Sequence, residues 1–127
     1  MVEKIVICIV SLLAIAFGVL IVYCGNAMKA GRLRPNGLLG TRTEFTMKSE
    51  NNWYIMQRKT ARSTILLGYS MFLWVPVFCI NHSALKSFFL LLVLVTQIVF
   101  IVLFWIDYFK GTKQVQSTEK TDSDILK

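Results

Sequence analysis

The sequence predicts an all-α integral membrane protein with three transmembrane helices. Three runs without a charged residue, 5–24, 63–85 and 87–106, support this fold class. A helix rises about 1.5 Å per residue, so roughly 20 residues cover a hydrocarbon core of about 30 Å. The overall composition agrees, because 55% of the 127 residues are hydrophobic and only 17% are charged. Soluble domains contain about 25% charged residues, so a soluble fold is disfavoured.

The first run, 5–24, carries a face of small residues that includes Ala14 and Gly18. Small side chains let helix backbones approach closely inside a bilayer, so both residues are candidates for helix packing. The sequence does not decide between packing within the three-helix unit and formation of a homo-oligomer. A disulfide between Cys8 and Cys79 also stays open, since both residues fall toward the same side of the membrane.

The segment between the first and second runs is strongly basic. By the positive-inside rule this segment is cytoplasmic, so we expect the N-terminus outside the cell and the C-terminus in the cytoplasm. Only Glu44 and Glu50 oppose its eight basic residues, and such a surface suits anionic lipid headgroups. The basic residues are Lys29, Arg32, Arg34, Arg42, Lys48, Arg58, Lys59 and Arg62.

Within this basic loop, Asn36-Gly37 is a strong turn signal, because both residues tolerate positive φ. Arg42 lies between two threonines and offers a forked donor for a carboxylate, a phosphate or backbone carbonyls. Ser49 then predicts a helix N-cap, followed by an amphipathic lead-in helix that continues into the second span. On that helix Trp53, Met56, Thr60 and Ala61 have near-helical spacing.

The second and third spans are separated by Lys86 alone, and we expect Pro76 to kink the second span. In the third span, Gln97 is a candidate for an interhelical hydrogen bond, since an amide in hydrocarbon needs a partner. The sequence therefore divides into a membrane domain, residues 1–110, and a polar tail, 111–127, that we expect to be disordered.

Several functional classes are disfavoured by what these segments contain. The three spans have no Asp, Glu, Lys or Arg, which argues against a proton-coupled transporter. The single histidine, His82, has no nearby carboxylate and is a poor general base. No cysteine or histidine spacing indicates a metal site, and no nucleic-acid-binding module is present. We therefore expect no enzymatic activity, no catalytic residues, no cofactor, no metal and no direct binding of nucleic acid.

The basic loop also carries a recognisable motif, Pro35-Asn36-x-x-x-Gly40-x-Arg42-Thr43, followed by Thr46, Trp53 and Arg58. This pattern resembles the signature of the SdpI/YfhL family, and its place between the first two helices of a three-helix unit is similar as well. Two positions depart from the family pattern, namely Gln57, where His or Asn is frequent, and Ala61, where Gly is common. The chain is also shorter than the family archetype, which carries additional helices before this unit.

The resemblance implies a multi-pass immunity protein of a bacterial plasma membrane that gives resistance to a secreted, membrane-active toxin or bacteriocin peptide. It also implies a cytoplasmic partner, a transcriptional repressor that the archetype holds at the membrane. The functional residues it implies are Asn36, Gly40, Arg42, Thr43, Trp53 and Arg58. Two alternatives are a membrane-anchored signalling or sequestration module without immunity activity, and a small structural membrane protein.

Overall fold

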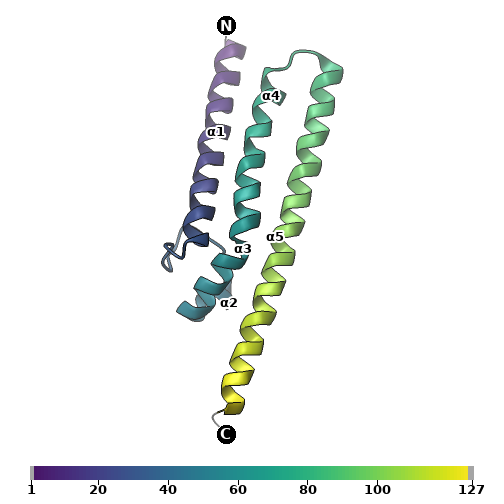
Figure 1. Cartoon of the computed structure of the whole chain (residues 1–127). Helices are drawn as coiled ribbons and strands as arrows, with labels where there is room; N and C mark the ends of the chain where they lie inside the picture. The colour runs from purple at the N-terminus through teal and green to yellow at the C-terminus, as the bar shows by residue number, and fades with distance from the viewer. Residues whose placement is uncertain (1, 126–127) are drawn as a thin grey trace.

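The computed structural model describes residues 2–125 and consists of helices joined by one long and several short connections (Figure 1). Three helical stretches are long and apolar enough to cross a membrane, namely Val2–Lys29, Glu50–Cys79 and Ser83–Thr121. This confirms the predicted fold class. The elements are α1 (Val2–Lys29), α2 (Glu44–Met47), α3 (Glu50–Ser70), the 3-10 turn η1 (Met71–Leu73), α4 (Trp74–Cys79) and α5 (Ser83–Ile125).

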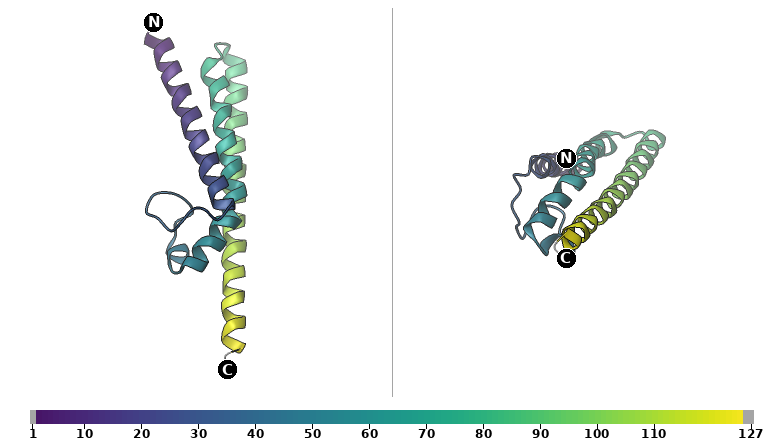
Figure 2. Two further views of the ribbon diagram at one scale, coloured as in Figure 1. Left: turned by 60° about the vertical axis from the view of Figure 1, so that its left-hand side comes forward. Right: turned by 60° about the horizontal axis from the view of Figure 1, so that its bottom comes forward.

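The middle span lies between the other two, so α3 packs against both α1 and α5 (Figures 1 and 2). The N-terminus and the turn between α4 and α5 are at one end of the bundle. The long connection from α1, the short helix α2 and the last turns of α5 are at the other (Figure 1). We call this second end, which contains residues 29–62, the basic end.

Close packing of α1 on α3 depends on glycines from both helices. A Cβ atom added at Gly18 would lie 3.0 Å from the carbonyl oxygen of Gly68, and one added at Gly68 would lie 2.8 Å from the backbone nitrogen of Val22. Gly25 approaches Ile65 in the same way, at 2.6 Å from its Cγ1 atom. Ala14 lies on this side of α1 and is half-buried. Backbones this close gain dispersion contacts that larger residues would prevent.

Polar side chains join α3 to α5 at two levels. The amide of Gln97 donates to the hydroxyl of Ser70 over 2.9 Å, at mid-membrane depth. Nearer the basic end, the hydroxyl of Ser63 donates to the carboxylate of Asp107. Hydrogen bonds between membrane helices contribute roughly 0.6 kcal/mol each on average, so these contacts supplement packing and do not replace it.

The second span is interrupted near Pro76, as expected for a proline inside a membrane helix. The α-helix α3 ends at Ser70, the chain continues as the 3-10 turn η1, and α-helix resumes as α4 at Trp74. Proline has no N–H, so the carbonyl four residues earlier, that of Phe72, loses its usual helical partner.

The predicted boundary between the second and third spans was wrong. The second span ends at Cys79, not at residue 85, and the connection is formed by residues 80–82. Lys86 lies in the first turn of α5, where its N–H donates to the carbonyl of His82 over 2.9 Å. Asn81 and His82 carry no formal charge, so a search for uncharged runs did not detect the connection that they form. Their polar side chains were a signal for a turn at this point.

The C-terminal tail also differs from its prediction. We expected disorder over 111–127, but α5 continues without a break to Ile125, and residues 126–127 lie outside the described part. The first turn of this extension packs on α3, since a Cβ added at Gly111 would lie 2.6 Å from the Sδ atom of Met56, and Val115 one turn later is buried. That contact anchors the extension and gives the following polar residues a helix to continue. All three cysteines are free thiols, with Cys8 and Cys79 exposed.

Candidate functional site

The connection from α1 to α2 starts with a tight reversal at Gly31. This glycine has φ +67°, and its N–H donates to the carbonyl of Met28 over 3.1 Å. The N–H of Arg32 donates to the carbonyl of Ala27 over 2.9 Å. The two bonds form a Schellman motif, which closes a helix and requires a residue that accepts positive φ. The chain therefore leaves α1 in a fixed direction and returns toward α3.

Asn36 organises the tip of the loop. Its Oδ1 atom accepts hydrogen bonds from the N–H groups of Leu38, at 2.9 Å, and Leu39, at 2.7 Å. Its Nδ2 atom donates to the carbonyl of Arg34 over 2.8 Å. One side chain thus satisfies three backbone groups, which is how asparagine stabilises turns.

Gln57 fixes the returning chain to α3. Its Oε1 atom accepts the N–H of Thr41 and its Nε2 atom donates to the carbonyl of Thr41, both over 2.9 Å. Gln57 is fully buried and Thr41 is only 6% exposed. The amide therefore pairs with the backbone as a neighbouring β-strand would. We call this pair of residues the amide clamp.

Two further polar contacts reinforce the amide clamp. The hydroxyl of Thr60 donates to the carbonyl of Met56 over 2.9 Å, which leaves its oxygen free to accept the hydroxyl of Thr41 over 2.7 Å. The indole N–H of Trp53 donates to the carbonyl of Leu33 over 2.8 Å. Trp53 is fully buried, so an unpaired N–H there would cost about 1–3 kcal/mol.

The last motif residues start α2. Thr43 is its N-cap and forms a capping box with Thr46, in which each side chain accepts from the backbone of the other. The hydroxyl of Thr43 also lies 2.9 Å from that of Tyr108 on α5, so this cap joins the loop to the third span. The guanidinium of Arg42 donates to the carbonyl of Gly37, which is one of the partners proposed for it, and it closes the loop on itself.

The structure gathers most of the predicted site in one place. Asn36, Gly40, Arg42 and Thr43 belong to one folded loop, and Trp53 supports that loop from α3. Arg58 lies beside the reversal at Gly31, where an added Cβ would be 3.1 Å from its Nη2 atom. Gly18 and Gln97 lie apart from the loop, in the helix contacts described above, and the half-buried Ala14 lies one turn before Gly18.

We did not predict from the sequence which residues hold the loop in place, namely Thr41, Gln57, Thr60 and Tyr108. A signal was present for two of them. Gln57 and Thr60 lie four and seven residues after Trp53, so they share its helical face, and all three are fully buried. Uncharged polar residues on the face of a buried tryptophan indicate a hydrogen-bonding partner from elsewhere in the chain.

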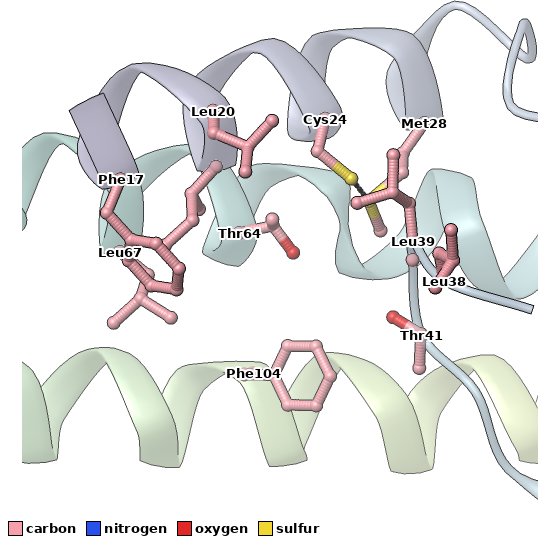
Figure 3. Close-up of a pocket in the computed structure, with 12 residues that line it drawn as sticks. Phe17, Leu20, Cys24, Met28, Leu38, Leu39, Thr41, Thr64, Leu67 and Phe104 are labelled. Atoms are coloured by element: carbon pink, nitrogen blue, oxygen red, sulfur yellow. Dashed lines mark hydrogen bonds between the residues drawn. The ribbon is translucent and has the colours of Figure 1, made fainter.

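Beside the loop, an apolar cavity of about 410 Å³ lies between the three spans (Figure 3). We call it the lateral cavity. Phe17, Leu20 and Cys24 line it from α1, and Phe104 points into it from α5 (Figure 3). Leu38, Leu39 and Thr41 of the loop close the end nearest the basic end (Figure 3). The motif loop is therefore one wall of a cavity of the size and polarity of a small-molecule site.

The charges of the site lie on its surface. The basic side chains of the loop and of the start of α3, from Arg32 to Arg62, are exposed. Within residues 2–125, no group of three or more Cys, His, Asp or Glu side chains is placed to hold a metal ion. The arrangement therefore combines an apolar cavity, a rigid loop and a cationic surface.

The sequence matches the model of a known protein family. The profile of the SdpI/YfhL protein family matches residues 32–106, which include the loop from Arg32 onward, α2, α3 and the uncharged part of α5. Searches of curated proteins and of solved structures found no significant match.

Proposed function

We propose that this chain, which belongs to the SdpI/YfhL protein family, protects a bacterial cell from a secreted, membrane-active peptide toxin. Membership in the family and the three membrane-spanning helices make it a membrane protein of the immunity type.

The lateral cavity is the main observation that supports a role in toxin resistance. Helices in a bilayer gain little from the hydrophobic effect, because lipid tails are as apolar as leucine, so a ligand is recognised by packing. A preformed cavity of about 410 Å³, walled by the motif loop, offers an apolar peptide segment contacts that lipid does not. We propose that the toxin inserts apolar side chains there, and that the amide clamp keeps the loop wall rigid.

The distribution of charge supports an orientation with the basic end in the cytoplasm and the N-terminus outside. The positive-inside rule applies to short loops near the ends of membrane helices, and residues 29–62 carry eight cations against two carboxylates. Labelling of single cysteines introduced at exposed positions, such as Lys48 and Lys86, with a membrane-impermeant reagent tests the orientation. Labelling of the Lys48 position in intact cells would contradict it.

Filling the lateral cavity tests the immunity proposal. Thr64→Phe places an aromatic ring in the cavity, and the hydroxyl that is lost donates only to the carbonyl of Thr60 in its own helix. The matched control is Thr96→Phe on α5, since the hydroxyl of Thr96 also donates within its own helix and Thr96 does not line the cavity.

In a toxin-sensitive strain, the wild-type chain and Thr96→Phe should raise survival under toxin, and Thr64→Phe should not at equal membrane abundance. No protection by the wild-type chain against any related peptide would refute the immunity proposal. Equal protection by both variants would refute the role of the cavity.

A second candidate function is the recruitment of a cytoplasmic repressor, with or without immunity. The helical extension of α5 beyond Asp107 supports this candidate, because it projects past the loop and presents exposed polar residues (Figure 2). Deletion of residues 116–127 should release a soluble partner while the membrane helices stay intact. Recovery of no soluble partner by the full chain, with and without toxin, would contradict this candidate.

We also propose that the protein is not an enzyme. The two carboxylates of the loop have structural positions, since Glu44 and Glu50 lie in the first turns of α2 and α3. Negative charge is favourable there, next to the unpaired N–H groups of a helix start. Substitution of both by glutamine should leave protection unchanged, whereas loss of protection at normal abundance would point to catalysis.

A further inference from the structure

A second concavity, of about 300 Å³, lies between α1 and α3 on the side of α3 that faces away from the lateral cavity. Arg62 lines this concavity and Thr64 lines the lateral cavity. Arg62 and Thr64 are two residues apart and therefore point about 200° apart around the axis of α3, so the two concavities lie on opposite faces of this helix. We call the second one the basic groove. It is lined by Lys29, Arg58, Ala61, Arg62, Ile65 and Leu66.

The lining of the basic groove divides into a cationic part and an apolar part. Lys29, Arg58 and Arg62 supply three positive charges, and none of the six lining residues is acidic. Asp107 lies beyond Arg62 on the side of α5, where its carboxylate accepts the hydroxyl of Ser63. Ile65 and Leu66 follow on α3 and extend the groove toward the membrane interior.

The position of the groove along the bundle matches the boundary between water and lipid. Lys29 is the last residue of α1, and Arg62 directly precedes the uncharged part of the second span. The three cations therefore lie at headgroup level, and Ile65 lies one turn deeper. Arg58 lies beside the reversal at Gly31, so its guanidinium is near the end of α1.

We propose that the basic groove binds one anionic phospholipid. Its phosphate lies between Lys29, Arg58 and Arg62, and the start of one acyl chain lies along Ile65 and Leu66. Arginine matches phosphate with paired donors, and lysine adds a point charge. The groove offers both parts of the ligand a complementary surface. This binding requires neither a toxin nor a particular orientation of the chain.

Lipid retention by the purified full-length protein tests the proposal. The protein is purified from membranes with equal phosphatidylglycerol and phosphatidylcholine, and bound lipid is counted by native mass spectrometry after mild detergent exchange. Each basic residue near a membrane surface contributes about 1 kcal/mol of attraction to anionic lipid, so losing two should weaken binding roughly 25-fold. We expect the wild type to retain one phosphatidylglycerol, and Lys29→Gln/Arg62→Gln to lose it.

The matched control is Lys86→Gln/Lys113→Gln, which removes the same net charge from exposed positions outside the groove. It should retain the lipid, as should Arg62→Lys, which keeps the charge and guards against a folding defect. Soluble glycerol 3-phosphate should not displace the lipid, and displacement by it would show a site for free phosphate alone. Equal retention of both lipids, or equal losses in the groove and control variants, would overturn the proposal.

Discussion

Replacing Gly40 by alanine tests whether the motif loop depends on a backbone conformation that glycine permits. Gly40 has φ +97°, a region that residues with a Cβ atom rarely enter. The added Cβ would lie 2.6 Å from the Oε1 atom of Gln57 and 2.9 Å from the Cδ2 atom of Leu33. The alanine methyl group would therefore collide with the side chain that forms the amide clamp.

The expected cost has two parts. The backbone conformation alone disfavours alanine by about 1–2 kcal/mol. Displacement of Gln57 also removes the two hydrogen bonds to Thr41, and each buried group left without a partner costs about 1–3 kcal/mol. A conservative total is about 3 kcal/mol, which corresponds to a change of roughly 100-fold in the equilibrium for opening the loop.

Amide hydrogen exchange in detergent micelles or nanodiscs measures that equilibrium directly, since exchange of a protected amide follows local opening. The N–H of Thr41 donates to Gln57, so a peptide covering residues 38–45 reports on the amide clamp. We expect exchange of this N–H to be about 100-fold faster in Gly40→Ala. Peptides from the middle of α1 and α5 should exchange as in the wild type.

Gly37→Ala is the matched control, because it makes the same chemical change three residues away. An added Cβ at Gly37 meets no atom within 4 Å, and Gly37 is not among the glycines with positive φ. Its effect should stay within about 0.5 kcal/mol. Similar exchange in the two variants, or wild-type exchange in Gly40→Ala, would refute the reasoning.

Three further predictions concern the contacts that hold the bundle and the loop together. Gln57→Glu loses the amide donor to the carbonyl of Thr41 and should destabilise the loop by about 2–3 kcal/mol in thermal unfolding, whereas the exposed Gln114→Glu should be neutral. Trp53→Phe keeps an aromatic ring but leaves the carbonyl of Leu33 without its donor, so it should lower the free energy of unfolding by about 1–3 kcal/mol. An unchanged thermal unfolding midpoint would contradict the assigned hydrogen bond. Gly68→Ala should lower the thermal unfolding midpoint, because the new Cβ would meet backbone atoms of α1. In Gly111→Ala the new Cβ meets the flexible end of the Met56 side chain, so this variant should gain up to about 1 kcal/mol of stability from helix propensity. Equal unfolding midpoints for the two variants would contradict this prediction.

The fold could be predicted because hydrocarbon is a demanding solvent. A segment that leaves backbone polar groups unpaired cannot cross it, so three uncharged runs of sufficient length required three helices. The helix ends were less predictable. Asn81 and His82 are uncharged and did not interrupt the apolar count. The continuation of α5 depends on the contact of Gly111 with Met56 of α3 and on the burial of Val115.

The candidate site was predictable where its interactions are local in sequence. The turn at Asn36 and the N-cap at Ser49 both form through side chains that bond backbone groups two or three residues away. The turn does not use the positive φ that was expected of Asn36 and Gly37, since neither residue has it. The amide clamp joins residues sixteen apart, and Thr43 meets Tyr108 across 65 residues. Such pairs depend on how α3 and α5 are placed, which local patterns do not encode.

The middle span has a consequence for biogenesis. Of the three spans it is the least apolar, and it is also the one enclosed by the other two. The first span can partition into the bilayer unaided as it leaves the insertion machinery. The second carries a buried serine at each of residues 63 and 70, whose partners, Asp107 and Gln97, are synthesised later. We therefore expect the second span to stay near the insertion machinery until the third emerges, so that the two enter the lipid as a pair.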